Sequence, residues 1–218
     1  MSEQFVIIGC GRFGSAVAQE LTKLGREVMI VDVDQDVVQN MSNIVTYAVQ
    51  ADVTDANTVK TLGIGNFDTA IVTMGANIQG SMLATLLVKE TGVKKVISKA
   101  QSKVHSQILY KIGADRVIFP EREMGIRLAK NLVSKNVLEF IELSEDYSVI
   151  ELRVTEDWIG KTLEELDMRK KYGVNVVAIK NLNDVNISVL GSYEIQENDR
   201  LVVIGQNENL NQFEKKEV

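Results

Sequence analysis

Three glycines near the N-terminus have the spacing of a phosphate-binding turn. Residues 9–14 read Gly-Cys-Gly-Arg-Phe-Gly, which fits the pattern G-x-G-x-x-G and follows a short apolar run at 5–8. In such a turn the glycines allow a tight bend, a close approach of backbone to phosphate, and close packing of a helix on a strand. The helix that follows offers free N–H groups and a positive dipole end to an anion. The pattern therefore predicts a nucleotide-phosphate site.

Two charged residues sharpen this prediction. Asp32 comes 18 residues after Gly14, at the end of the next apolar run, where its carboxylate can accept from both ribose hydroxyls. The same carboxylate would repel a 2′-phosphate, so NADP is disfavoured. Arg12 lies inside the turn, where its guanidinium can fork onto a terminal phosphate; a surface ion pair is the alternative. Cys10 is interpreted as a small buried side chain rather than a nucleophile.

The sequence lacks the usual catalytic sets. None of the five tyrosines is followed by Lys four residues later, and neither G-x-S-x-G nor G-x-x-x-x-G-K-[ST] occurs. His105 is the single histidine and is expected on the surface of a helix rather than as a general base. One Cys and one His also make a zinc site improbable, since such sites use several of these ligands. A nucleotide-binding sheet without an acid, base or nucleophile indicates a sensor and not an enzyme.

Composition and charge exclude other classes. The 218 residues carry a net charge of −6. Residues 1–137 have 15 Lys/Arg against 13 Asp/Glu, and residues 138–218 have 9 against 17. Neither half has the basic surface that nucleic-acid binding needs, and the change of sign suggests a domain boundary. One cysteine gives no intramolecular disulfide. The uncharged stretch 69–88 contains Thr, Asn, Gln, Ser and Gly, so we expect a buried strand and a helix rather than a membrane span. No signal peptide is visible, and an intracellular protein is expected.

Strand and helix patterns alternate through the first half. Apolar runs at 5–8, 27–31, 47–50, 69–73, 95–98 and 116–119 predict strands. Amphipathic stretches between them predict a first helix that follows Gly14 and ends at Gly25, and further helices at 36–41, 55–62, 78–91 and 104–112. Strict alternation implies parallel βαβ units. The predicted fold is α/β, a Rossmann-like doubly wound parallel sheet.

The second half has a different pattern. Pro120 is expected to end the sixth strand, and a helix is predicted from 121 to about Phe140. Strands are then predicted at 147–154, 174–179, 185–190 and 200–204, with a helix opened by Thr162 and a capping-box Glu165. The order β-α-β-β-β predicts a small α+β domain. The expected limits are 1–120 for the nucleotide-binding domain, 121–140 for a helical linker and 141–218 for the second domain.

Several longer motifs resemble one family. The chain is similar to Ktr/Trk-type potassium uptake regulatory subunits of the RCK (KTN) domain family, and most of all to KtrA-like members. The likeness rests on residues 6–14, 31–34, 67–77, 99–101, 111–115, 119–124 and 169–173. It implies an N-terminal and a C-terminal RCK domain joined by a helical crossover. It also implies a cytoplasmic homodimer that assembles into an octameric ring beneath a dimeric potassium-translocating membrane subunit.

The resemblance further implies the ligands. Ktr-type members bind ATP and ADP in the N-terminal domain, with NAD(H) as a further candidate from Trk-type relatives. The implied site comprises Gly9, Gly11, Arg12, Phe13, Gly14, Asp32, Asp52, Gly75, Lys99 and Glu121. Asp52 would lie at the adenine end and Lys99 near phosphate. Glu121 would help bind a cation, although a carboxylate satisfying a helix dipole is the alternative.

The C-terminal domain is similar to receptors for cyclic di-AMP. The implied contacts are Leu163, Asp167, Met168, Arg169, Tyr172 and Asn175. Some family sites have Pro in a later loop where this chain has residues 190–192, Leu-Gly-Ser. Two other functions remain open at this point: an NAD-dependent oxidoreductase, and a stand-alone cyclic-dinucleotide-binding protein.

Overall fold

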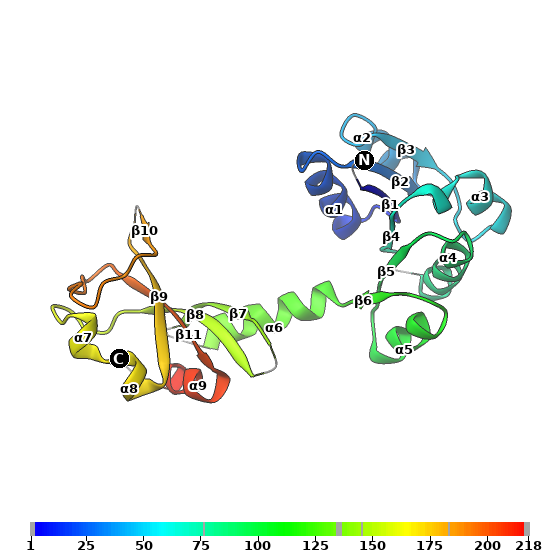
Figure 1. The fold of residues 1–218 in the computed structure, drawn as a ribbon. Coiled ribbons are helices and arrows are strands. Elements are labelled where there is room, and N and C mark those ends of the chain that lie inside the picture. The colour runs from blue at the N-terminus through cyan, green and yellow to red at the C-terminus, as the bar shows by residue number, and fades with distance from the viewer. Residues whose placement is uncertain (1–2, 76, 134–136, 145, 183, 216–218) are drawn as a thin grey trace. The chain divides into compact units, whose positions relative to one another are not determined.

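The chain forms two compact units that divide after Glu121 (Figure 1). The computed structural model describes residues 3–75, 77–133, 137–144, 146–182 and 184–215. The N-terminal unit is a six-stranded parallel sheet in the order β3-β2-β1-β4-β5-β6. Its strands are β1 (Gln4–Ile8), β2 (Glu27–Asp32), β3 (Tyr47–Gln50), β4 (Thr69–Val72), β5 (Lys95–Lys99) and β6 (Arg116–Ile118). The predicted doubly wound parallel sheet is confirmed.

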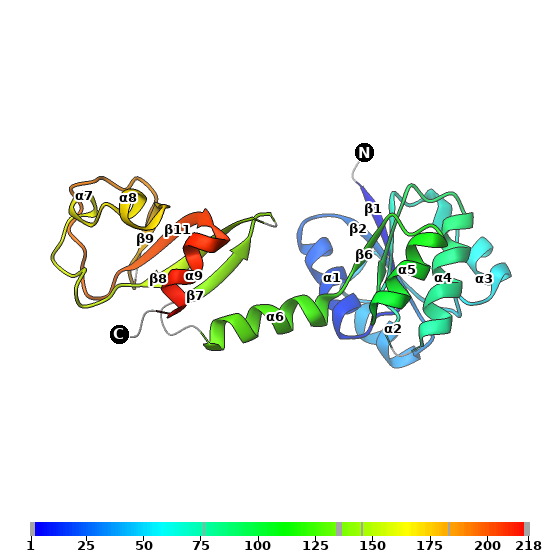
Figure 2. The same cartoon turned by 90° about the horizontal axis from the view of Figure 1, so that it is seen from below.

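Helices cover both faces of this sheet. They are α1 (Arg12–Lys23), α2 (Gln35–Met41), α3 (Ala56–Thr61), α4 (Ile78–Glu90) and α5 (Lys103–Lys111). Figure 2 shows α1 and α2 on one side of the strands and α3, α4 and α5 on the other. Buried side chains such as Ile7 and Ile30 face α1 and α2, whereas Val6 and Ile8 face the opposite layer. The strands are apolar on both faces because both are covered.

The C-terminal unit is built on an antiparallel sheet in the order β10-β9-β11-β8-β7. Helix α6 (Pro120–Val133) leads into it from the N-terminal unit. The other elements are β7 (Val137–Glu142), β8 (Tyr147–Arg153), α7 (Leu163–Leu166), α8 (Met168–Tyr172), β9 (Val174–Lys180), β10 (Val185–Asn186), β11 (Arg200–Gln206) and α9 (Asn207–Lys215). One face of the sheet packs against α7, α8 and α9 through a core that includes Leu152, Leu201 and Phe213. The predicted small α+β domain is confirmed, as is the capping box of Thr162 and Glu165.

The structure corrects two predicted elements of the second half and adds a helix that was not predicted. Helix α6 ends at Val133, and Phe140 lies in β7, where it pairs with Ile150 of β8. The apolar spacing of this segment fits the period of a helix as well as that of a strand, and its pairing with β8 makes it a strand. The predicted strand 185–190 is reduced to Val185–Asn186, because Ser188 N donates to the Asn186 side chain at 2.9 Å and the local turn competes with pairing. Sequence analysis also missed α9, which buries Leu210 and Phe213.

Two smaller findings concern the first half. Pro120 does not end β6, which stops at Ile118; it is the first residue of α6, a position that tolerates proline. The uncharged stretch 69–88 is β4 followed by α4, as predicted. In the described part of the chain, no helix is long and apolar enough to cross a membrane.

Candidate functional site

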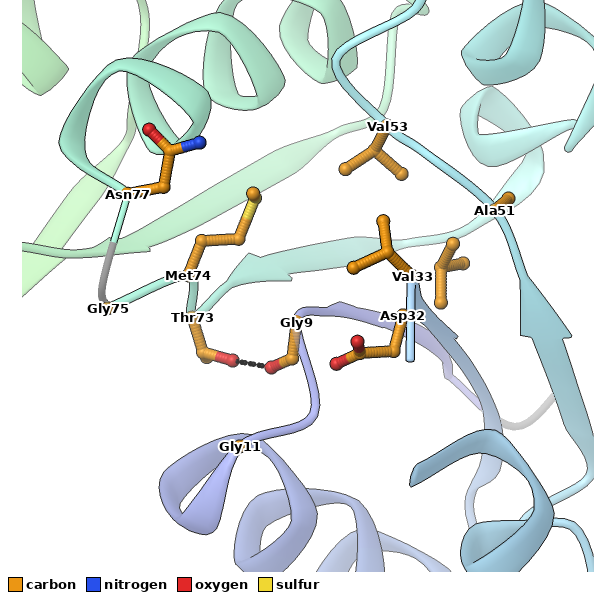
Figure 3. A pocket seen from close by; sticks show the side chains of 11 residues that line it. Gly9, Gly11, Asp32, Val33, Ala51, Val53, Thr73, Met74, Gly75 and Asn77 are labelled. Atoms are coloured by element: carbon orange, nitrogen blue, oxygen red, sulfur yellow. Dashed lines mark hydrogen bonds between the residues drawn. The ribbon is translucent and has the colours of Figure 1, made fainter. Parts of the chain in front are cut away.

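A cavity of about 310 Å³ opens at the carboxyl ends of β1, β2 and β4. The register places Ile8, Val31 and Val72 side by side, so the loops after these three strands meet at one edge of the sheet. The strand order reverses between β1 and β4, which is where doubly wound sheets bind ligands. Figure 3 shows the residues that surround this cavity.

The glycine turn forms one wall, and its three glycines have different reasons to be there. Gly9 has a φ of +82°, and a Cβ there would lie 2.9 Å from the Met74 side chain. A Cβ on Gly14 would overlap the Gly9 carbonyl oxygen and lie 2.6 Å from Thr73 Oγ1. Gly11, by contrast, has an ordinary extended conformation, with φ −63° and ψ −171°, and a Cβ there would meet no atom within 4 Å. The fold itself therefore requires Gly9 and Gly14 but not Gly11.

The first turn of α1 also differs from those of the neighbouring helices. In α2, α3, α4 and α5 the N-cap side chain accepts a hydrogen bond from a backbone N–H of the first turn; these N-cap residues are Asp34, Asp55, Asn77 and Ser102 respectively. The N-cap of α1 is Gly11, which has no side chain to do so. Its N–H groups are left for another acceptor at the edge of the cavity.

Asp32 lies at the carboxyl end of β2 with its carboxylate toward the glycine turn (Figure 3). Its Oδ2 accepts from Cys10 N at 2.5 Å and its Oδ1 from Asp34 N at 3.0 Å. These two bonds fix the carboxylate at the cavity wall. The remaining lone pairs are available to hydroxyl donors.

The rest of the cavity is mainly apolar and was missed by sequence analysis. The additional lining residues are Val31, Val33, Ala51, Val53, Thr73, Met74 and Asn77. These residues lie at or just after the carboxyl ends of β2, β3 and β4, so the predicted strand ends could have indicated them. An apolar slot beside a carboxylate suits a flat base.

Of the ten residues expected in this site, Gly9, Gly11, Asp32 and Gly75 line the cavity. Asp52 does not: it is exposed, and its Oδ1 accepts from Thr54 N at 2.9 Å and Thr54 Oγ1 at 2.7 Å. The pKa of Asp52 is lowered by these two bonds, the hydroxyl first. Its neighbours Ala51 and Val53 line the cavity instead.

The remaining expected residues gather beyond Gly75. Lys99 Nζ pairs with the Glu121 carboxylate, lies 6.0 Å from the Phe13 ring centre, and would lie 3.5 Å from a Cβ on Gly75. The hydrogen bond from Lys99 is the main cause that holds the pKa of Glu121 below its usual value, and the charges of Lys99 and Arg12 lower it further. Arg12 is exposed and makes no ion pair with any residue in the described ranges. Two cations and one carboxylate thus stand beside the cavity.

The predicted cation at Glu121 stays a prediction. No group of three or more His, Cys, Asp or Glu side chains that could hold a metal gathers among the residues described in the structure. Glu121 has the Lys99 ammonium as its partner instead.

Cys10 and His105 are both buried in the N-terminal unit. Burial, and then the Asp32 charge, raises the pKa of the Cys10 thiol to about 12, so the interpretation as a buried filler is confirmed. The expected surface position of His105 is wrong, because the residue is 2 % exposed. Its Nδ1 accepts from Gln101 N at 3.4 Å, and burial lowers its pKa. The helical pattern did not reveal which face of α5 packs inward.

A second pocket, of about 660 Å³, lies in the C-terminal unit. Five of the six residues expected to hold a cyclic dinucleotide line it: Leu163, Asp167, Met168, Arg169 and Asn175. Glu164, Val174, Val176, Val189 and Gly191 complete its lining. Asp167 joins α7 to α8 in a left-handed conformation, with φ +43°, and directs the chain around the pocket.

Tyr172 lies elsewhere. Its ring packs in the core with Phe213 at a centroid distance of 5.1 Å and with Trp158 at 6.3 Å. Tyr172 therefore packs α8 against the core and does not line the pocket.

Two domain families match the chain. The TrkA-N domain matches residues 5–120, and the TrkA-C domain matches residues 149–217. Ktr system potassium uptake protein C of Bacillus subtilis is 45 % identical over 99 % of this chain and 98 % of its own length. Ktr system potassium uptake protein A of the same organism is 42 % identical over 98 % of this chain and 96 % of its own length. The chain belongs to the Ktr/Trk family of potassium uptake regulatory subunits.

Solved structures share the fold of this Ktr/Trk subunit. The crystal structure of the GsuK RCK domain superposes with a TM-score of 0.69 at 18 % identity, over 98 % of this chain and 47 % of that chain. The GsuK channel bound to NAD superposes with a TM-score of 0.68 at 17 % identity, over 98 % of this chain and 39 % of that one. This chain thus spans less than half the length of these GsuK chains, and the similarity establishes the RCK fold.

Proposed function

We propose that this Ktr/Trk subunit is a cytoplasmic, non-enzymatic regulator that binds ATP or ADP in the N-terminal cavity and controls potassium uptake. Its target is a dimeric potassium-translocating membrane subunit, at whose cytoplasmic face a homodimer assembles into an octameric ring. The names of the curated relatives and their nearly full coverage support the potassium system.

Gly11 is the observation that carries the nucleotide proposal. The protein has neither a steric nor a conformational reason for glycine at this position, because the space around it is open. A phosphate approaching the uncapped first turn of α1 supplies that reason, since a Cβ would keep it from the backbone N–H groups. An oxyanion there would also satisfy donors that Gly11 leaves without a cap.

Other residues fit an adenosine beside that phosphate. Asp32 holds the ribose hydroxyls, and Val33, Val53 and Met74 cover the base. Arg12 and Lys99 lie toward the far phosphates. GsuK has been solved bound to NAD and to ADP, which supports this ligand class, with NAD(H) as a second candidate.

The C-terminal pocket is proposed to bind cyclic di-AMP. Arg169 suits a phosphate and Asn175 an adenine edge, while Leu163 and Met168 offer apolar cover. The long side chains exposed on α6 support self-association: Met124, Leu128 and Leu132 are 57 %, 56 % and 76 % exposed.

The test is a calorimetric titration of the full chain with ATP, ADP, NADH and cyclic di-AMP. Asp32→Asn is expected to weaken ATP and ADP together by roughly 1–3 kcal/mol, the scale of lost charged hydrogen bonds, and to leave cyclic di-AMP binding unchanged. Asp36→Asn, which removes the same charge at an exposed position of α2, is the control. A wild-type protein that binds neither ATP nor ADP would contradict the proposal, as would equal loss of all ligands in Asp32→Asn.

A further inference from the structure

A third pocket, of about 510 Å³, lies in the C-terminal unit and is lined mainly by charged and polar side chains. Six of its lining residues are Leu138, Glu139, Glu151, Lys180, Leu182 and Arg200. None of the residues that line it also lines the pocket of Arg169. The two sites are therefore separate, and the third is called the charged pocket below.

The four charged residues of this pocket stand on the sheet face that points away from α7, α8 and α9. Each is next in sequence to a side chain that packs in the core on the other face, namely Phe140, Ile150, Ile179 and Leu201. Successive side chains of a strand point to opposite faces. The four charged residues come from β7, β8, β9 and β11, so the charged pocket spans four neighbouring strands.

Strand pairing places like charges directly opposite one another on this face. Arg200 is opposite Lys180 on one side and opposite Arg153 on the other. Two residues along β8, Glu151 is opposite Glu139 of β7. Like charges directly opposite each other destabilise a sheet. The face therefore carries a row of three cations beside a row of two carboxylates, and both rows are unfavourable without partners of the other sign.

Glu151 relieves only part of this repulsion. Its side chain is 6 % exposed, and its two oxygens accept from Lys180 Nζ at 2.6 Å and from Arg200 Nη1 at 3.2 Å. These bonds hold both cationic side chains at the pocket, where they are 40 % and 49 % exposed and keep further N–H donors. Glu139, by contrast, is exposed and makes no ion pair with any residue that the structure describes.

We infer that the charged pocket binds a free α-amino acid with an apolar side chain, a ligand separate from the nucleotides of the proposed function. The ligand carboxylate takes the spare donors of Arg200 and Lys180, and its ammonium group faces Glu139. A zwitterion adds an anion to the cation row and a cation to the carboxylate row, which an ion of one charge cannot do. Leu138 and Leu182 line the same pocket, and Leu182 is 78 % exposed, so they offer apolar surface to the ligand side chain.

The experiment titrates the full chain with L-leucine by calorimetry. Arg200→Gln is expected to bind L-leucine at least roughly tenfold more weakly, as for a lost charged hydrogen bond. Arg200→Lys keeps a charge beside Glu151 but lacks the planar fork, and its affinity should lie between those of wild type and Arg200→Gln. Glu139→Gln is expected to bind roughly twofold to fivefold more weakly, the scale of an exposed ion pair.

Two analogues of leucine test the two ends of the ligand. Isocaproate lacks the ammonium group and isoamylamine lacks the carboxylate, so both should bind more weakly than L-leucine. Isoamylamine should be the weaker of the two, because it offers nothing to Arg200 and Lys180. Glu139→Gln should weaken the binding of L-leucine but not that of isocaproate, which has no ammonium group for Glu139 to meet.

Lys161→Gln and Glu156→Gln are the matched controls. They remove one charge of each sign at exposed positions of the same unit, outside the charged pocket, and should bind L-leucine as wild type does. Melting curves check that each variant is folded. A wild-type protein that does not bind L-leucine would overturn the inference and leave the proposed function standing. Isocaproate binding as tightly as L-leucine would also overturn it, as would equal losses in Arg200→Gln and Lys161→Gln.

Discussion

The N-terminal cavity and the C-terminal pocket of Arg169 are made from different parts of the polypeptide. The N-terminal cavity is formed by glycine backbone, apolar side chains and the carboxylate of Asp32. The C-terminal pocket is formed mainly by side chains, which include the charged groups of Glu164, Asp167 and Arg169 beside apolar residues of α7, α8 and β9. A backbone site is sensitive to added atoms, and a side-chain site is sensitive to removed ones. The difference predicts which substitutions matter in each unit.

The largest expected effect comes from adding one methyl group to the glycine turn. Gly14→Ala places a Cβ against the Gly9 carbonyl oxygen and 2.6 Å from Thr73 Oγ1, inside packed structure. We expect a loss of about 3 kcal/mol, the upper end of the usual cost of overpacking, because the nearest atom is backbone and cannot shift cheaply. This loss lowers the melting temperature of the N-terminal unit by several degrees. Circular dichroism follows the whole chain, and fluorescence of Trp158, the single tryptophan, follows the C-terminal unit.

Gly11→Ala separates stability from binding at the same turn. Its Cβ enters open space, so the melting curve without ligand should match that of wild type while ADP binding is lost. If Gly11→Ala binds ADP normally, the backbone N–H groups of α1 do not hold the phosphate. A Trp158 transition that shifts with Gly14→Ala would show that the two units do not melt independently.

Removing a side chain from the C-terminal pocket should have the second-largest effect. Arg169→Ala deletes the guanidinium that lines this pocket and is expected to weaken cyclic di-AMP binding by roughly 1.5–3 kcal/mol, the scale of charged hydrogen bonds. Calorimetry measures this loss, with Lys170→Ala, an exposed neighbour on α8, as the control. Equal losses in the two variants would indicate a general charge effect and not a defined contact.

The sequence predicted some parts of each site and missed others, for physical reasons. Glycine spacing and the position of Asp32 after β2 are local properties, and the parallel sheet brings those strand ends together. Val53 and Met74 were not found because an apolar residue at a strand end has no chemical mark. Tyr172 was expected at the ligand because it is a polar residue of segment 163–176, which resembles the cyclic di-AMP site of the family. Its packing partner Phe213 belongs to α9, which local sequence patterns did not suggest.

The smallest expected effect is a loss of stability in acid, which should begin at a different pH in each unit. His105, the single histidine, is buried in the N-terminal unit, and burial lowers its pKa. In the C-terminal unit burial alone would raise the pKa of Glu151, but hydrogen bonds from Lys180 at 2.6 Å and Arg200 at 3.2 Å outweigh it, and the pKa is lowered. As the pH falls, the N-terminal unit should therefore lose stability before the C-terminal unit does.

The sign follows from which state binds more protons. Below the ordinary histidine value of about 6.5, the unfolded chain protonates His105 while the folded one resists, so stability falls as the pH falls below that value. The contribution of Glu151 is complete above the ordinary glutamate value of about 4.3 and is lost only as the pH falls through its lowered folded value. Of these two groups, only His105 changes the stability between these two pH values.

Three features of His105 oppose its protonation together. It is buried, its Nδ1 already accepts from Gln101 N, and it lies in the first turn of α5, where a positive charge opposes the helix dipole. The resulting loss of stability at about pH 5.5 is at most about 1.4 kcal/mol, the limit for one group one pH unit below its unfolded pKa.

Hydrogen exchange of α5 at about pH 7.5 and pH 5.5 measures this loss, after correction for the intrinsic exchange rates. His105→Asn keeps an acceptor near Gln101 N without titrating, so its α5 should lose less stability on acidification than wild type. If α5 of wild type and His105→Asn loses the same stability, the acid effect belongs to carboxylates. If NMR of the single imidazole shows protonation near pH 6.5 in the folded chain, its burial does not control its charge.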